Sequence, residues 1–440
     1  MHRSRLTTLA LTGALALTAL GTGSASAAPA PAAPAPVARP GHQVEAFAED
    51  GTISHAQAPA GSRFTAPRAL AAAPVAGDGT VTPIVQSGPT AAKLDIVMVG
   101  DGYTAGQQAQ FRADAAAKWQ QIAAVEPYKT YRGLFNVWAV EAVSAESGVS
   151  GDPDKATVRQ TALGSYFWCD DVERLLCVDT DAVERYAAKA PQADLVIVVA
   201  NSAKYGGAGY NDVVSSLGYS GIATVAGGNA QSGQIAVHET GHSLGKLADE
   251  YFYAGQGTYQ GSEPAEANIS KLTAAQLTRT RTKWYRWLGQ TSPDGGKVGA
   301  YLGGGYYEKG LYRPTDNSIM RSLGREFNLP GREAMIAGFY RYASTLASST
   351  PTSAGLTQAD RLSVELPVPG TQLRWYLDGR EVASLRDRTA LDLSALKLTG
   401  PKGRAHRLTA VATDPTSAVR DPGLRTGLTD SLSWEVTRSR

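Results

Sequence analysis

One short run of the sequence, HETGH at His238–His242, contains residues whose types and spacing could bind a metal and support hydrolysis. Residues four apart lie on the same face of an α-helix, so both histidines could bind one zinc ion, at about 2.0 to 2.1 Å. Glu239 would then lie beside the open coordination position, where it could accept a proton from a zinc-bound water. The run therefore predicts a zinc hydrolase site with Zn²⁺ as cofactor and Glu239 as general base.

The run could instead be a chance match on a solvated helix, because the motif is short. The distribution of histidine argues against this alternative. The chain has 6 histidines, and those outside the run all fall outside the region expected to be catalytic: His2, His42, His55 and His406.

A third protein ligand must come from further along the chain. If the helix continued, Asp249 would lie about 10 Å along its axis from His242, too far to share an ion. Gly245 is a natural place for the helix to end, and a turn there would let Asp249 or Glu250 fold back onto the metal. We expect Asp249 to be the third ligand and keep Glu250 as the alternative.

The elements that would position this motif form a mixed sheet with helices, an α+β fold. Apolar runs predict strands at 95–99, 135–143, 195–200 and 222–225, with further short strands at 42–47 and 80–85. A stripe of apolar residues predicts a helix through Phe111, Ala115, Trp119 and Ile122. A second helix should begin near Asp181, with Glu184 completing a capping box. The motif helix should begin near Ser232 and bury Ile235, Val237 and Leu244.

The stretch Tyr205-Gly206-Gly207 precedes the motif helix and has two interpretations. It could form a sheet edge to which a peptide adds as an extra strand, or it could be an ordinary glycine-rich loop. A tyrosine hydroxyl could help to stabilise the oxyanion that forms when water attacks a peptide carbonyl. The sequence leaves five candidates for it: Tyr205, Tyr210, Tyr251, Tyr306 and Tyr307.

Downstream, the run NSIMR at Asn317–Arg321 resembles a methionine turn, in which Met320 would form an apolar floor beneath the metal. Met320 could also be a simple core residue. The arrangement is similar to the metzincin pattern HExxHxxGxxH. It departs from that pattern because Ala248 stands in place of the last histidine, and the acid follows at Asp249.

Other motifs occur in order along the same region: DGYT at 101–104, EPY at 126–128, FNV at 135–137, ESGV at 146–149 and HETGHSLGKLADEY at 238–251. Together they resemble the bacterial IgA metallopeptidase family of metzincin-like zinc proteases, over about residues 81–347. The resemblance implies a zinc endopeptidase with His238 and His242 as ligands, Glu239 as general base and an acidic third ligand, Asp249. It does not imply that IgA is the substrate.

The N-terminus predicts export. A basic start, an apolar stretch and small residues before position 28 describe a signal peptide over residues 1–28. No later apolar run is long enough for a membrane span. With 19% charged residues and a net charge of +2, nothing calls for nucleic acid as a partner. We expect a secreted, extracellular monomer that acts on a protein or peptide.

The only cysteines, Cys169 and Cys177, favour a disulfide in an exported chain, the alternative being two buried free thiols. We expect residues 29–83 to form an Ala/Pro-rich linker or N-terminal pro-region. Residues 84–348 are expected to form the zinc metallopeptidase domain. Residues 355–440 show short alternating strands typical of an immunoglobulin-like β-sandwich. Trp375 should be a core residue of that domain, or else a surface aromatic that binds polysaccharide.

Two other functions remain open beside the secreted zinc endopeptidase. One is a secreted binding or adhesion protein with a vestigial metal site, against which the intact His238, Glu239 and His242 count. The other is a zinc amidase that acts on cell-wall peptides, which would use the same chemistry in a different cleft.

Overall fold

The structure is a computed structural model, and it describes residues 41–59 and 76–438. The predicted signal peptide and most of the Ala/Pro-rich stretch that follows it lie outside the described residues. Within the described part of the chain, no helix combines the length and the apolar character needed to cross a membrane.

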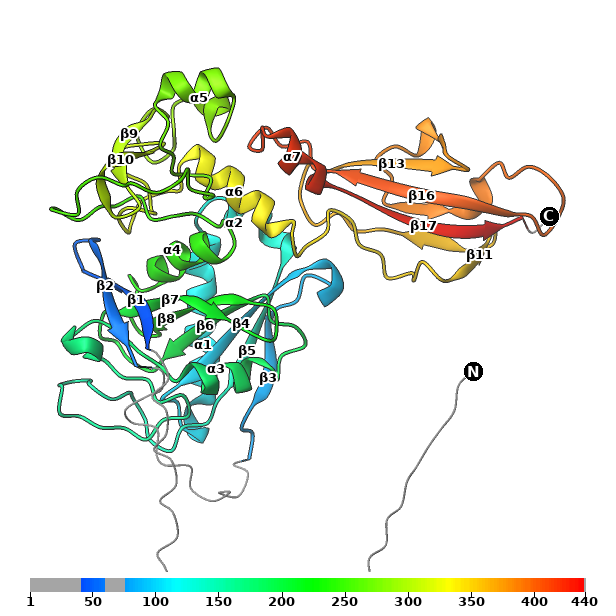
Figure 1. The fold of residues 1–440 in the computed structure, drawn as a ribbon. Coiled ribbons are helices and arrows are strands. Elements are labelled where there is room, and N and C mark those ends of the chain that lie inside the picture. The colour runs from blue at the N-terminus through cyan, green and yellow to red at the C-terminus, as the bar shows by residue number, and fades with distance from the viewer. Residues whose placement is uncertain (1–40, 60–75, 439–440) are drawn as a thin grey trace, which may run out of the picture. The chain divides into compact units, whose positions relative to one another are not determined.

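The main element is a mixed sheet of eight strands in the order β2-β1-β7-β8-β6-β4-β5-β3 (Figure 1). The strands are β1 (His42–Phe47), β2 (Ile53–Ala58), β3 (Thr80–Val85), β4 (Leu94–Asp101), β5 (Phe135–Glu141), β6 (Leu195–Ala200), β7 (Gly207–Val214) and β8 (Ser220–Ala226). The four central strands β8, β6, β4 and β5 are parallel, whereas β1, β2, β3 and β7 pair antiparallel. The predicted strands are confirmed, and the glycine-rich stretch after Tyr205 proves to begin a strand.

Both faces of the sheet are covered, which explains why its central strands are continuously apolar. On β4, Ile96 and Met98 belong to one core and Val97 and Val99 to the other. The helices of this part are α1 (Gln108–Ala123), α2 (Tyr128–Tyr131), α3 (Thr180–Ala187), α4 (Gly233–Ser243), α5 (Ala274–Thr280) and α6 (Leu329–Phe339). Side chains of α1 and α4 pack into the first core and those of α3 into the second.

Two predicted helix caps are wrong. Helix α3 begins one residue before Asp181, and Asp179 caps it by accepting a hydrogen bond from Ala182 N. Glu184 instead accepts hydrogen bonds from Ser215 and Ser216. Ser232 does precede α4, but its hydroxyl donates to the Gly206 carbonyl and does not cap the helix.

The loop that follows β5 is fixed to the sheet by one carboxylate and is closed on itself by one disulfide. Asp101, in the DGYT motif at the end of β4, is fully buried. It accepts hydrogen bonds from Leu163 N and Ser165 N, each at 2.9 Å. Cys169 and Cys177 form the predicted disulfide further along.

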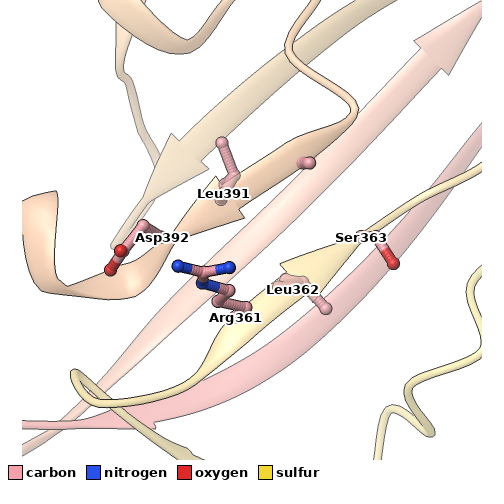
Figure 2. Close-up of a pocket in the computed structure, with 6 residues that line it drawn as sticks. Arg361, Leu362, Ser363, Leu391 and Asp392 are labelled. Atoms are coloured by element: carbon pink, nitrogen blue, oxygen red, sulfur yellow. The ribbon is translucent and has the colours of Figure 1, made fainter.

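The C-terminal region contains a five-stranded sheet in the order β11-β17-β16-β13-β14 and a separate pair, β12 and β15. Its elements are β11 (Gly355–Thr357), β12 (Arg361–Ser363), β13 (Gln372–Leu377), β14 (Arg380–Glu381), β15 (Ala390–Asp392), β16 (Ala405–Thr413), α7 (Pro422–Arg425) and β17 (Thr429–Thr437). Trp375 is fully buried against Trp434, so it is a core residue and not a surface aromatic. A shallow pocket of about 430 Å³ lies along β12 and β15, where Arg361 and Asp392 are register partners (Figure 2).

Asp101→Ala should destabilise the part of the chain that contains the eight-stranded sheet, because it leaves the buried Leu163 and Ser165 amides without acceptors. Each buried unsatisfied group costs roughly 1 to 3 kcal/mol. The melting temperature, measured by calorimetry, should fall by several degrees, at about 2 to 4 °C per kcal/mol for a domain of this size. Asp154→Ala is the control, since Asp154 is exposed and accepts only from its own turn. Equal melting temperatures for the two variants would contradict the structural role of Asp101.

Candidate metal centre

Helix α4 brings both motif histidines to one point because two backbone carbonyls orient their rings. His238 Nδ1 lies 2.9 Å from the Ile319 carbonyl oxygen, and His242 Nδ1 lies 2.8 Å from that of Leu247. A carbonyl only accepts, so each Nδ1 carries a proton, and each Nε2 faces the cluster, where it can bind a cation once it has lost its own proton. The two Nε2 atoms are 3.1 Å apart. This arrangement is suited to two imidazoles that share one cation.

The turn predicted after the helix is present, and it needs the small Gly245, since a Cβ there would lie 2.7 Å from the Gly241 carbonyl oxygen. Helix α4 ends at Ser243, and Lys246 adopts the left-handed conformation with φ 49°. Leu247 N then donates back to the Gly241 carbonyl. The chain therefore reverses within one turn of His242 and returns toward the imidazoles.

Asp249 reaches the histidines as a result. Its Oδ1 lies 3.4 Å from His238 Nε2 and 3.5 Å from His242 Nε2. Its Oδ2 accepts a hydrogen bond of 2.7 Å from the Tyr306 hydroxyl. Oδ1 has no hydrogen-bond partner within the described residues, although it is buried. A buried acceptor without a donor is what a cation at this point would satisfy.

Glu250 points the other way. It accepts hydrogen bonds from Asn268 Nδ2 at 3.0 Å, Ser318 Oγ at 2.8 Å and Asn328 Nδ2 at 2.9 Å. Burial raises the pKa of Glu250 to about 7 despite these donors. Its backbone N–H also donates to the Met320 carbonyl. Glu250 therefore ties the turn after α4 to the run at Asn317–Arg321.

Met320 lies directly beneath α4, as expected of a methionine turn. It is 1% exposed. A Cβ added at Gly241 would come within 2.5 Å of the Met320 sulfur, so the helix can approach the turn only with glycine at that position. The neighbouring Ile319 supplies the carbonyl that orients His238. The turn thus both supports the helix and orients a predicted ligand.

A fourth group, which the sequence analysis missed, completes the cluster. Glu45 of β1 places Oε2 3.0 Å from His238 Nε2 and Oε1 3.4 Å from His242 Nε2. Potential ligand atoms of Glu45, His238, His242 and Asp249 all lie within 4.8 Å of one another. The strand at 42–47 was predicted, but a single glutamate within it carries no ligand signal.

The carboxylates and imidazoles of the cluster shift one another's pKa values toward the charged forms. Burial opposes charge on His238, but the Glu45 and Asp249 carboxylates raise its pKa to about 10. They also raise the pKa of His242 well above its usual range, again against burial. In turn the imidazoles lower the pKa of Asp249 and of Glu45, although burial and the second carboxylate oppose this. Two carboxylates and two imidazole nitrogens form a donor set that suits a divalent ion such as zinc.

Glu239 lies beside the cluster on α4 and is 2% exposed. Neither of its carboxylate oxygens has a hydrogen-bond partner within the described residues. Burial, and next the Glu45 carboxylate, raise the pKa of Glu239 to about 8. Gly209 of β7 makes room for it, because a Cβ there would lie 1.9 Å from the Glu239 carboxyl carbon. The Glu239 carboxyl group therefore lies between α4 and β7 without a hydrogen-bond partner among the described residues.

The candidate tyrosines separate into two groups. Tyr210 is fully buried and accepts from Val178 N, and Tyr205 donates to the Ala48 carbonyl. Tyr251 and Tyr306 pack together, and Tyr306 donates to Asp249. Tyr306 and Tyr307, with His242 and Asp249, also line a pocket of about 410 Å³.

The sequence matches the family model described as IgA Peptidase M64 over residues 82–294 and 290–339. The matched residues include both motif histidines, Glu239, Asp249 and Met320, and they leave out Glu45 with strands β1 and β2. The resemblance expected from the sequence is confirmed. No curated protein matches the chain.

Asp249→Ala should weaken zinc binding, whereas Glu250→Gln should keep it, because only Asp249 lies next to the imidazoles. Loss of an outer partner alone costs 10- to 100-fold in metal affinity, so loss of Asp249 should cost at least about tenfold even if Glu45 remains bound. Chelator competition on folded protein measures both affinities. A larger loss in Glu250→Gln than in Asp249→Ala would transfer the role to Glu250.

Proposed function

The chain belongs to the IgA Peptidase M64 family, and we propose that it is a secreted zinc endopeptidase with His238, His242 and Asp249 as metal ligands and Glu239 as general base. Family membership makes it a metallopeptidase. The observation that carries the finer proposal is the convergence of two oriented imidazoles and a buried carboxylate, beside a second carboxylate that has no hydrogen-bond partner in the described structure.

The proposed ligands are held by contacts with the rest of the protein. Carbonyls of Ile319 and Leu247 fix both imidazoles, and the Tyr306 hydroxyl holds Asp249. Outer contacts of this kind orient ligands and raise their basicity. When bound, zinc would supply Lewis-acid chemistry, polarising the peptide carbonyl and lowering the pKa of water to about 7.

Glu239 is suited to move a proton within that chemistry. Its carboxylate is buried, has a raised pKa and faces β7 across Gly209. A base with a pKa near the working pH can take a proton from attacking water and later deliver it to the leaving amine. A substrate strand paired antiparallel with β7 would pass between this carboxylate and the metal ligands.

The turn after α4 and the methionine beneath it support a metzincin-like domain in which aspartate replaces the third histidine. The signal-peptide pattern and the disulfide support secretion. We propose that the C-terminal region is an immunoglobulin-like β-sandwich, on the basis of its two sheets and shared apolar core. A vestigial metal site is disfavoured, because every group that the chemistry needs is present and oriented.

Glu239→Gln should retain zinc, because neither imidazole is touched, and should lower turnover by at least about 10²-fold through loss of proton transfer. Turnover is measured on a mixed peptide library with and without chelator, and zinc by metal analysis. Since Glu45 lies at the ligands, the comparison is made in both the wild-type and the Glu45→Gln backgrounds. Unchanged turnover in a zinc-replete Glu239→Gln protein would exclude the mechanism.

A further inference from the structure

We propose that residues 42–58, strands β1 and β2, form an autoinhibitory hairpin that occupies the peptide-binding edge of the enzyme and closes its metal centre with Glu45. The inference rests on the proposed peptidase function. If the proposal is correct, the hairpin occupies the active site of the full chain and inhibits peptide hydrolysis there. We call this segment the N-terminal hairpin.

The first argument is the number of ligands. Zinc sites that catalyse reactions have three protein ligands and an open position for water, whereas structural sites have four ligands and are closed. His238, His242 and Asp249 account for three. Glu45 is the fourth, at 3.0 Å from His238 Nε2. With Glu45 in place, the position that water must occupy is taken.

The second argument is the way in which the hairpin binds. In the sheet, β1 is antiparallel to β7, and Glu45 is the register partner of Gly209. Gly209 is also the residue over which Glu239 lies. A peptide that adds to this edge would therefore place its backbone opposite Gly209, between the general base and the metal ligands. The hairpin fills that place and sets the Glu45 carboxylate against the imidazoles.

Further contacts hold the Glu45 carboxylate and the start of the hairpin. Asn211 of β7 donates to Glu45 Oε1 at 3.1 Å. The next residue, Asp212, accepts from Gln43 N and lies 3.0 Å from His42 Nδ1. These polar contacts from the end of β7 fix the register of β1, so Glu45 and not a neighbour meets the imidazoles.

Apolar and aromatic packing binds the rest of the hairpin. Phe47 is fully buried, and its ring lies edge-on to His238 with 5.4 Å between centroids. On β2, His55 packs against Tyr306 at 4.7 Å and lies 2.8 Å from the Tyr253 hydroxyl. The hairpin thus covers the metal ligands with one strand and the tyrosines beside Asp249 with the other.

The other strands of the sheet and the other proposed site residues lie outside the hairpin. Both hairpin strands lie at one end of the sheet, beside β7 (Figure 1). Without them the order β7-β8-β6-β4-β5-β3 stays continuous. The family match begins at residue 82, after the hairpin, and includes all the other proposed site residues. The one disulfide joins Cys169 to Cys177 and does not tie the hairpin down.

The experiment compares Glu45→Gln with Glu49→Gln in the full chain. Both remove one carboxylate from the same hairpin, but Glu49 is exposed and away from the metal ligands. Loss of one charge-assisted contact weakens the hairpin enough to raise hydrolysis of a quenched fluorescent peptide by at least about tenfold. Glu49→Gln should match the wild type. Asn211→Ala removes the hydrogen bond to Glu45 Oε1 and should also raise hydrolysis.

A second measurement does not need activity. In the Glu239→Gln background, the protein is loaded with Co²⁺ and its visible spectrum is recorded. Removal of the Glu45 ligand should change the spectrum, and Glu49→Gln should not. In the same background, a labelled extended peptide should bind more tightly once Glu45 is replaced, as measured by fluorescence anisotropy.

The outcomes are distinguishable. A wild-type chain as active as Glu45→Gln would overturn the inference, as would a Glu45→Gln protein that loses both metal and activity, since Glu45 would then be a permanent ligand. If no variant hydrolyses peptides while the Co²⁺ spectrum responds only to Glu45, the closed centre stands and the peptidase assignment fails.

Discussion

The structure of the site depends on two backbone carbonyls that fix the motif imidazoles. Those of Ile319 and Leu247 accept from the Nδ1 atoms and so aim both Nε2 atoms at one point. For Leu247 to do this, α4 must end at once and the chain must reverse. For the Ile319 carbonyl to accept from His238, the turn at Met320 must lie under the helix. Gly241 permits this close approach because it has no side chain. Helix, reversal and methionine turn are therefore one unit.

Two adjacent carboxylates show how the environment assigns roles. The imidazoles lower the pKa of Asp249, against burial, and keep it ready to bind a cation. Burial raises the pKa of Glu250, whose hydrogen bonds within the described residues come from amide and hydroxyl donors. Their side chains meet different partners, the His238 imidazole for Asp249 and the amide groups of Asn268 and Asn328 for Glu250. One residue thus faces the metal position while the next holds the loops around it.

Much of this could be predicted from local sequence patterns. The strands around Asp95–Val99 and Leu195–Ala200 and the motif helix follow from apolar periodicity and spacing. The place of Met320 follows from the resemblance of NSIMR to a methionine turn. Some local choices could not be predicted. Asp179 caps α3 in place of Asp181, and Lys246 takes the left-handed position that glycine favours. Several neighbouring residues could fill each of these positions, and tertiary contacts decide between them.

Glu45 could not be predicted for a different reason. It is 193 residues from His238, and only the pairing of β1 with β7 brings them together. One of the two interpretations of the stretch at Tyr205 was a sheet edge that accepts an extra strand, but the sequence could not identify the strand. Long-range pairing of this kind depends on register and burial, which no local motif records.

Anomalous diffraction at the zinc edge, from crystals of the zinc-loaded full chain, tests the central claim most directly. The account predicts one peak at about 2.0 to 2.2 Å from His238 Nε2, His242 Nε2, an Asp249 oxygen and a Glu45 oxygen. A peak bound by Glu250, or a zinc ion with water in the place of Glu45, would contradict it.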